Sequence, residues 1–145
     1  MTISIREMMT KKLETIEEAS SIRDSAKKMM DTNVSSLVVV DGEGRLQGIV
    51  TERDIVRKAC VNDVRTSEVT NREIMSSNLI FIQSNSSASE AVDLMVQNNI
   101  RHLFVIDKEN IEKPVGMITP LDLRWEEYSD EGLMDAIEEL SMYYR

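Results

Sequence analysis

The sequence predicts a mixed α/β fold in which two copies of a β-α-β-β-α unit pack about a pseudo-twofold axis, followed by an amphipathic helix. Three observations carry this prediction: an internal repeat, a recurring order of strand-like and helix-like segments, and an acidic segment outside the repeat. The chain has 145 residues, of which 41% are hydrophobic and 30% charged. This size and composition are typical of one compact domain or of two half-domains that share a core.

The repeat is visible at two offsets. Arg6-Glu7-Met8-Met9 returns 66 residues later as Arg72-Glu73-Ile74-Met75. After a two-residue insertion, the segment 48–54 returns 68 residues later as 116–122, and 15 of the 45 aligned positions are identical. We therefore infer a duplication in which each copy is too small to bury a good core alone.

Each copy opens with a short strand and a helix. The strands are predicted at residues 13–16 and 79–82. Ser21-x-x-Asp24 and Ser87-x-x-Glu90 are capping-box patterns, which mark helix starts because hydroxyl and carboxylate oxygens accept from free amides of the first turn. The apolar residues that follow have helical spacing: Ile22, Ala26, Met29 and Met30 in the first copy, and Ala88, Ala91, Val92 and Met95 in the second.

Each copy closes with a hairpin and a second helix. The apolar runs Leu37–Val40 and Leu103–Ile106 do not alternate, so we expect strands that are buried on both faces. A turn at 41–44 leads to a returning strand at 48–51. The second helix is predicted to begin at Glu52 in the first copy and at Pro120 in the second, because proline is favoured at the first helical position.

These elements give the expected domain bounds. We expect the first copy over residues 5–61, a polar connection over 62–71, the second copy over 72–125 and an acidic helix over 126–145. In the last segment, Leu133, Ile137, Leu140 and Tyr144 share one helical face, with acids opposite. This face either covers the domain's own core or contacts a partner or a second copy.

Charge and composition exclude several classes of protein. The chain carries 17 Lys and Arg against 26 Asp and Glu, a net charge of −9, so a broad basic face for general nucleic-acid binding is not expected. The apolar runs are too short for a membrane helix, and residues 1–10 do not resemble a signal peptide. A single cysteine, Cys60, fits a reducing cytoplasmic setting.

The residues that close each copy resemble a known family. They read Gly48-Ile49-Val50-Thr51-Glu52-Arg53-Asp54 and Gly116-Met117-Ile118-Thr119-Pro120-Leu121-Asp122. A tandem β-α-β-β-α unit with this Gly-h-x-Thr-x-x-Asp ending resembles the cystathionine β-synthase (CBS) domain pair, or Bateman module, over about residues 5–125. One departure is that Val38 and Phe104 stand where the family often has proline.

The resemblance implies a stand-alone regulatory module that binds an adenosine-containing ligand in a cleft between the copies. AMP, ADP or ATP are the expected ligands, and S-adenosylmethionine is a further member of this class. Asp54 and Asp122 would contact the ribose hydroxyls, while Thr51 and Thr119 would contact ribose or phosphate. The resemblance also implies a homodimer, and a signal passed to an unidentified protein or through that dimer.

The two clefts are expected to differ. The Asp54 cleft would be completed by Ile80 and Phe81, with Arg101 and His102 near the phosphate, since basic residues at these positions contact phosphate in the family's kinase gamma subunits. The Asp122 cleft offers serines at 35 and 36 and a carboxylate at 14, which disfavours an anionic ligand. We expect the nucleotide in the Asp54 cleft, and the other to be empty or to hold a less charged ligand.

The same residues have plainer interpretations. Thr51-x-x-Asp54 and Thr119-x-x-Asp122 also match the capping box, and capping alone would explain them. His102 could be a packing residue and Arg101 an interface ion-pair partner, while Arg53, Arg57 and Lys58 are typical of a solvated helix face. The alternative function is thus a ligand-free structural adaptor that docks through its helices and acidic tail.

Catalytic and metal chemistry are not expected. The sequence has no phosphate-binding Gly-x-x-x-x-Gly-Lys loop and no dinucleotide Gly-x-Gly-x-x-Gly motif. One histidine and one cysteine do not make a typical zinc site. We therefore expect neither an enzyme nor a metal centre.

Overall fold

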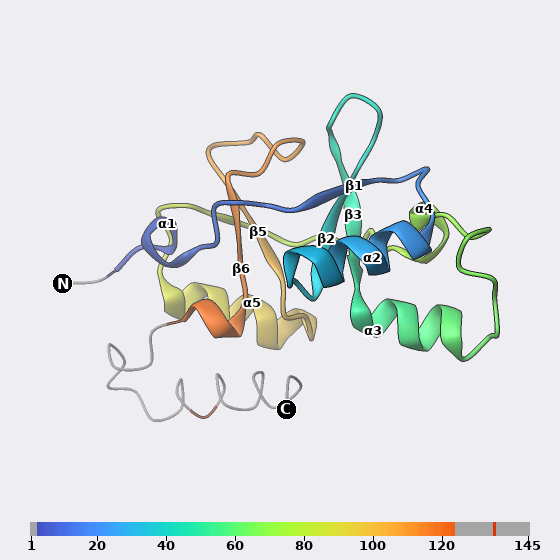
Figure 1. Ribbon diagram of the computed structural model, residues 1–145. Coiled ribbons are helices and arrows are strands. Elements are labelled where there is room, and N and C mark those ends of the chain that lie inside the picture. The colour runs from blue at the N-terminus through green and yellow to red at the C-terminus, as the bar shows by residue number, and fades with distance from the viewer. Residues whose placement is uncertain (1–2, 124–134, 136–145) are drawn as a thin grey trace. The chain divides into compact units, whose positions relative to one another are not determined.

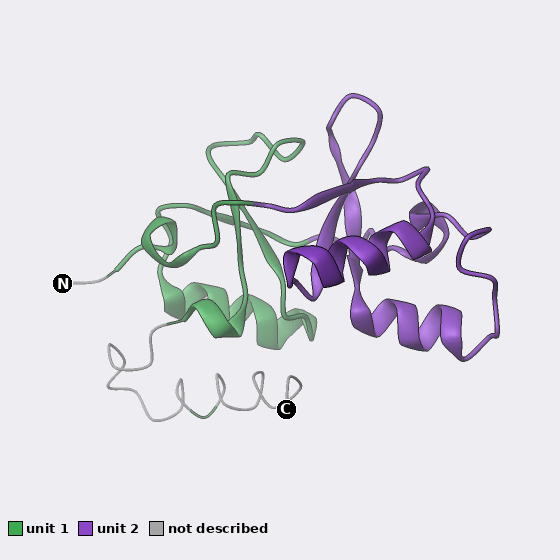
Figure 2. Cartoon of the chain, in the orientation of Figure 1, with its two compact units in different colours: residues 1–12, 80–145 green, residues 13–79 purple. Residues whose placement is uncertain are grey.

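The computed structural model describes residues 3–123 and residue 135, and the chain forms two compact units. Unit 1 comprises residues 1–12 and 80–145, and unit 2 comprises residues 13–79 (Figure 2). Each unit contains one three-stranded sheet with its helices, so the predicted mixed α/β fold class is confirmed (Figure 1). Apart from residue 135, the helix predicted over 126–145 lies outside the described residues, and the pseudo-twofold axis stays a prediction.

Unit 2 follows the predicted β-α-β-β-α order. Its elements are β1 (Thr15–Glu17), α2 (Ile22–Thr32), β2 (Ser36–Val40), β3 (Leu46–Thr51), α3 (Glu52–Asp54), the π-helix η1 (Ile55–Cys60) and α4 (Asn71–Ile74). The sheet order is β1-β2-β3, with β1 parallel and β3 antiparallel to β2. The parallel pair is possible because α2 crosses from the end of β1 to the start of β2.

Unit 1 repeats this topology. Its elements are α1 (Ile5–Met8), β4 (Phe81–Gln83), α5 (Ala88–Asn98), β5 (Leu103–Ile106), β6 (Gly116–Ile118) and the 3-10 helix η2 (Pro120–Asp122). The sheet order is β4-β5-β6, with the same parallel and antiparallel pairings. All four residues of β5 are buried, as its unbroken apolar run predicts.

The predicted helix starts are confirmed, and the first strands are displaced. Ser21 caps α2 by accepting from the Asp24 amide at 3.1 Å, and Ser87 forms a capping box with Glu90 at the start of α5. The first strands begin two residues later than predicted, at Thr15 and Phe81. The apolar pattern of the sequence does not fix where a strand begins. Each first strand begins where its backbone pairs in parallel with the buried central strand.

Two short helices, α1 and α4, are absent from the sequence prediction, although both lie in the repeat. Each packs in the unit of the other copy, so the compact units cut the chain at 12/13 and 79/80 instead of between the copies. Ile5, Met8 and Met9 contribute to the core of unit 1 beside α5. Ile74 contributes to the core of unit 2 beside α2. The leading helix of each copy therefore completes the core of the other.

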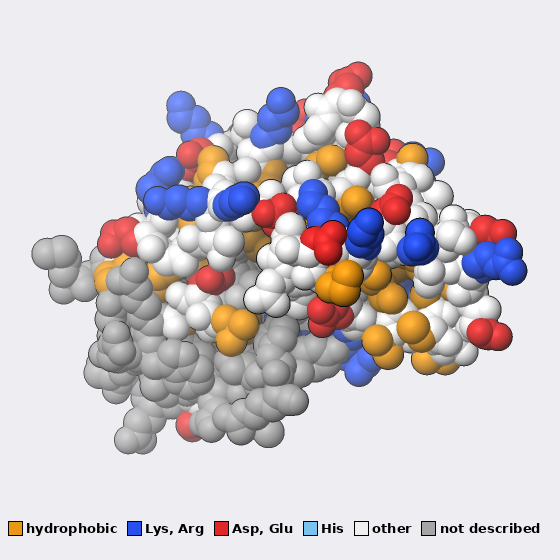
Figure 3. Space-filling view, viewed as in Figure 1, with side chains coloured by type: hydrophobic (Ala, Val, Ile, Leu, Met, Phe, Trp, Pro, Cys, Tyr) orange, Lys and Arg blue, Asp and Glu red, His pale blue; other side chains and the backbone are white. Residues whose placement is uncertain are grey.

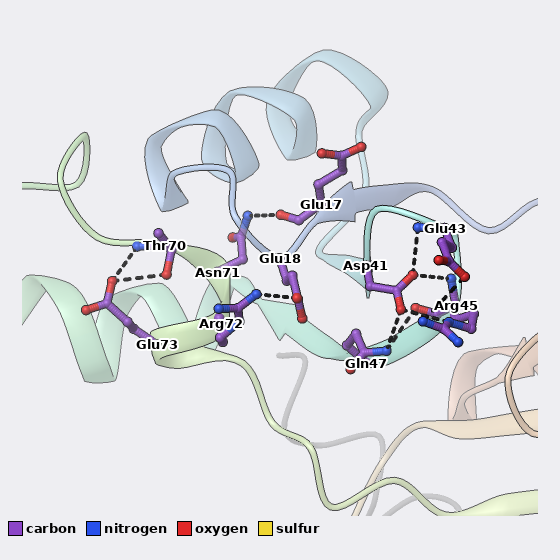
Figure 4. A network of polar contacts seen from close by, with 10 residues as sticks. All are labelled: Glu17, Glu18, Asp41, Glu43, Arg45, Gln47, Thr70, Asn71, Arg72 and Glu73. Atoms are coloured by element: carbon purple, nitrogen blue, oxygen red, sulfur yellow. Dashed lines mark hydrogen bonds and ion pairs between the residues drawn. The ribbon is translucent and has the colours of Figure 1, made fainter.

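Polar contacts hold α4 in unit 2 (Figure 4). The Asn71 side chain is fully buried and donates to the carbonyl oxygens of Glu17 and Ser20, at 3.0 Å each. It also accepts from Ser25 Oγ at 2.5 Å. Arg72 pairs with Glu18, a contact that raises the pKa of Arg72. The network joins the start of α4 to the end of β1 and to α2.

A matching contact holds α1 in unit 1. Arg6 donates to Ser84 Oγ at 2.8 Å and to Asp107 Oδ1 at 2.5 Å. Arg6 and Arg72 are equivalent in the repeat, and so are Ser84 and Glu18, because both pairs are 66 residues apart. The two copies therefore keep the position of this contact, while the equivalent partner position holds a serine in unit 1 and a glutamate in unit 2.

The motif glycines allow a close approach of the chain. A Cβ added at Gly48 would lie 2.7 Å from the carbonyl oxygen of Ser76, and one at Gly116 would lie 2.9 Å from that of Thr10. Backbone bridges join these segments to the returning strands, at Ile49 with Ser76 and at Thr10 with Met117. Each glycine thus gives room for the segment that follows the leading helix.

Candidate functional site

Thr51 and Asp54 lie where β3 meets α3 in unit 2. The Asp54 side chain is 13% exposed, and its Oδ2 accepts from the amide and the hydroxyl of Thr51 at 3.0 and 3.1 Å. The Thr51 hydroxyl in turn accepts from the Asp54 amide at 3.1 Å. The second oxygen, Oδ1, lies 3.1 Å from Lys58 Nζ. Because that lysine also donates to the carbonyl oxygen of Ile74 at 2.8 Å, it links Asp54 to the end of α4.

Thr119 and Asp122 occupy the equivalent place in unit 1, between β6 and η2. Asp122 Oδ2 accepts from the amide and the hydroxyl of Thr119 at 2.9 and 3.2 Å. Its Oδ1 accepts from Thr10 Oγ1 at 3.1 Å. The two carboxylates therefore have the same arrangement at Oδ2 and differ at Oδ1, which meets an ammonium in unit 2 and a hydroxyl in unit 1.

The capping interpretation of both motifs is thereby confirmed, and it does not use up the carboxylates. A carboxylate has about four acceptor positions. Each carboxylate accepts from two donors at Oδ2 and from one at Oδ1, so Oδ1 is the oxygen at which a further donor would be accommodated. Binding a cis-diol, which brings two donors, requires that one existing donor move away.

Four further predicted residues lie in unit 1, at the sheet end that carries Thr119. Ile80 precedes β4 and accepts from the Phe104 amide at 3.0 Å, while Phe81 pairs with Phe104 in register. His102 precedes β5 and Thr119 follows β6, on either side of the register pair Leu103–Ile118. Arg101 and His102 are half-buried. The sequence grouped these residues with Asp54 across the two copies, and that grouping stays a prediction.

In unit 2 the corresponding sheet end carries Ser35, Ser36 and Glu14. Ser36 pairs with Thr51 in register, and the carbonyl oxygen of Ser35 accepts from the Glu52 amide at 2.9 Å. Lys28 Nζ lies 3.9 Å from the Glu14 carboxylate. The acidic character that the sequence assigned to this end is therefore partly offset by a lysine from α2.

Sequence reasoning missed the role of Lys58. It was expected on a solvated helix face, and its side chain is 44% exposed, yet the ammonium bridges Asp54 and Ile74. The available signal was the spacing of four residues between Asp54 and Lys58, which brings opposite charges together on one helical face.

A groove of about 670 Å³ lies in unit 2 between α2 and the helical segment 52–60. Its lining comes from both helices and from the residues that follow α2: Ala26, Met29, Met30, Asn33, Val34, Ser35, Glu52, Ile55 and Val56. Met30 is 74% exposed and Val56 is 56% exposed, and Figure 3 shows apolar side chains gathered over these helices. The groove is lined by neither Thr51 nor Asp54, so it is separate from the motif carboxylate.

Two further features concern residues 3–123 and 135, the part of the chain that the structure describes. This part of the chain holds no cluster of three or more histidine, cysteine or acidic side chains that could bind a metal ion. Within the same residues, every helix is too short or too polar to cross a membrane.

Known proteins resemble this chain in sequence and in fold. The CBS domain family model matches twice, over residues 5–60 and 72–126. The CBS domain-containing protein YhcV of Bacillus subtilis is 30% identical over 138 residues, which cover 95% of each chain. A solved CBS domain protein of Thermoplasma acidophilum, TA0289, has the same fold, with a TM-score of 0.82, 21% identity and coverage of 98% of this chain and 78% of that chain.

A third relative was solved with ligands. The CBS domain pair of protein MJ0100, in complex with 5′-methylthioadenosine and S-adenosyl-L-methionine, has a TM-score of 0.71 and 28% identity, and the match covers 83% of this chain and 95% of that chain. Two family matches in one chain coincide with the duplication seen in the sequence and with the two repeated sheets. The chain belongs to the CBS domain family, as a protein with a tandem pair of CBS repeats.

Proposed function

We propose that this CBS pair is a non-catalytic regulatory sensor that binds an adenosine-containing ligand of the AMP, ADP or ATP class, with S-adenosylmethionine as a further candidate. The functional copies are taken as residues 5–61 and 72–125. The observation that carries the proposal is the Thr-x-x-Asp motif, which ends the third strand of each unit and leaves acceptor capacity on a carboxylate. The adenosine compounds held by the MJ0100 pair support the ligand class.

The chemistry of each residue fits this ligand. A carboxylate accepts hydrogen bonds from both hydroxyls of a ribose, which distinguishes ribose from deoxyribose. In the proposed principal site, Asp54 takes the ribose and Thr51 takes ribose or phosphate. Arg101 and His102 would meet the phosphate, because Arg offers a planar fork of donors to phosphate oxygens. Ile80 and Phe81 would supply apolar surface to the adenine.

The proposal is tested by calorimetric titration of the full chain with AMP, ADP, ATP, S-adenosylmethionine and 2′-deoxy-AMP. Asp54→Asn is the key variant, because an amide oxygen can still accept from the Thr51 amide while the charge is lost. We expect affinity for the ribose ligand to fall by about tenfold or more, the loss of one charge-assisted hydrogen bond. Asp31→Asn, at an exposed position of α2, is the matched control and should bind as the wild type does.

Each outcome decides a point. One ligand per chain supports the single-cleft expectation, whereas two per chain mean that Asp122 and Thr119 form a second working site. Wild-type affinity in Asp54→Asn would refute the site assignment. If no adenosine compound binds, the sensor proposal fails and the adaptor remains.

The adaptor alternative is favoured by the apolar groove between α2 and η1, where exposed Met30 and Val56 offer a surface for another helix. A homodimer formed through such helices, and a cytoplasmic setting, belong to both proposals. In the sensor, the dimer or a partner protein would read the ligand-induced change. In the adaptor, docking itself would be the function.

A further inference from the structure

We propose that Lys58 is the positioning residue that couples occupation of the Asp54 site to α4. This inference rests on the proposed function and adds its regulation. The ammonium of Lys58 has two acceptors at once: Asp54 Oδ1 at 3.1 Å and the carbonyl oxygen of Ile74, the last residue of α4, at 2.8 Å. Both contacts lie within unit 2.

The competition is set by the acceptor positions of Asp54. Oδ2 already receives two donors from Thr51, so it has no position left. Oδ1 has one position beside Lys58 Nζ. A ribose diol that places a hydroxyl on each oxygen must displace the Thr51 hydroxyl, and its second hydroxyl then shares Oδ1 with the ammonium. Because both donors at Oδ1 draw on the same carboxylate charge, we expect the bound ligand to weaken the attraction between Asp54 and Lys58 without displacing the ammonium.

The second acceptor of Lys58, the Ile74 carbonyl oxygen, lies where the end of α4 meets β3. Ile74 is buried in the core of unit 2, and two residues later the Ser76 amide donates to the carbonyl oxygen of Ile49 at 2.9 Å. The Met75 amide donates to the carbonyl oxygen of Asn71 at 2.9 Å. Asp54 holds the Lys58 ammonium in place to donate to the carbonyl oxygen of Ile74. If the attraction to Asp54 weakens, the hydrogen bond to Ile74 forms for a smaller fraction of the time. A ligand at Asp54 should thus loosen the end of α4 where it meets β3.

Among the described residues of unit 1, the equivalent carboxylate oxygen meets a hydroxyl where unit 2 has an ammonium. Asp122 Oδ1 receives a hydroxyl from Thr10, which can rotate away without breaking an ion pair. The repeat positions of Asp54 and Asp122 are equivalent, yet the position four residues after Asp122 is Glu126, where Lys58 stands after Asp54. The sequence asymmetry therefore places the proposed lysine contact at the first motif.

Thermodynamic reciprocity makes the proposal quantitative. If the ligand weakens the Lys58 contact by some factor, removing that contact must tighten the ligand by the same factor. A partly exposed ion pair implies a factor of about two to ten. Lys58→Met should therefore bind 5′-methylthioadenosine, a diol without phosphate, about two- to tenfold more tightly than the wild type does. A merely structural lysine would give unchanged or weaker binding.

The experiment combines titration with amide hydrogen exchange on the full chain. In the wild type, saturating 5′-methylthioadenosine should speed exchange at the Met75 and Ser76 amides about two- to tenfold. Lys58→Met should show the faster exchange without ligand, and no further change with it. Lys27→Met, at an exposed position of α2, is the control and should leave both readouts unchanged.

The failures are distinguishable. If the ligand binds in an Asp54-dependent way but exchange at Met75 and Ser76 is unchanged or slower, the Lys58 proposal is overturned while the proposed function stands. Unchanged or weaker binding in Lys58→Met overturns it as well. If the wild type binds no adenosine compound, the proposed function fails and the Lys58 proposal falls with it.

Discussion

The buried side chain of Asn71 should be the strongest polar anchor of α4, and Asn71→Ala tests it. The substitution removes two hydrogen bonds of 3.0 Å to the carbonyl oxygens of Glu17 and Ser20, and the acceptor of the Ser25 hydroxyl. The two carbonyls keep other donors, since the Ser20 amide reaches Glu17 and the Asn71 amide reaches Ser20. Ser25, which is fully buried, is left without that acceptor.

The magnitude follows from these contacts. Three hydrogen bonds at about 1 kcal/mol each, with some compensation at the carbonyls and a small cavity, give a loss of about 2–4 kcal/mol in the free energy of unfolding. Urea unfolding followed by circular dichroism measures it. Asn85→Ala, at an exposed position, is the control and should change stability by no more than about 0.5 kcal/mol.

A double-mutant cycle isolates the buried pair. Ser25→Ala removes the hydroxyl that Asn71→Ala would strand, so the double variant should lose less than the sum of the single losses, by about 1 kcal/mol. Simple additivity, or an Asn71→Ala loss no larger than that of Asn85→Ala, would refute the anchoring role.

Two further predictions concern the contacts that hold the leading helices α4 and α1 in their units. Gly48→Ala should lower the free energy of unfolding by about 1–3 kcal/mol in thermal melts, because its Cβ would lie 2.7 Å from the Ser76 carbonyl oxygen. Gly42→Ala is the control and should be near neutral, because a Cβ there meets no atom within 4 Å. Equal effects of the two substitutions would contradict this prediction. The Ser84 hydroxyl and then the Arg6 guanidinium lower the pKa of Asp107, so its stabilising effect is present above the ordinary value near 4 and is lost as pH falls through the lowered pKa. The stability gap between the wild type and Asp107→Asn should therefore be largest at neutral pH and shrink in acid, and a gap independent of pH would refute this assignment.

Local signals in the sequence predicted much of the fold. Ser21 and Ser87 mark their helix starts because a capping hydroxyl acts within one turn. The run Leu103–Ile106 marks a buried strand because burial on both faces removes alternation. The short helices α1 and α4 escaped prediction, although Thr70-x-x-Glu73 is a visible capping pattern. A four-residue helix is stable only through tertiary packing, and local pattern does not tell which core it joins.

The candidate site was predictable to a different degree. The pairs Thr51/Asp54 and Thr119/Asp122 could be singled out because the duplication presents the same motif twice. The donor that meets Asp122 Oδ1 could not be predicted, because Thr10 and Asp122 are far apart in sequence and meet only in the folded unit. The contact of Lys58 with Ile74 depends likewise on where α4 packs.

The exchange of leading helices bears on the order in which the chain can fold during synthesis. Unit 2 is one continuous stretch, so it can close as soon as residue 79 has left the ribosome. Unit 1 is discontinuous, and Ile5, Met8 and Met9 must wait, with their apolar surface uncovered, until α5 and β6 have been made. During synthesis, residues 1–12 therefore depend on residues 80 onward to complete unit 1, while unit 2, the stretch between them, can fold first.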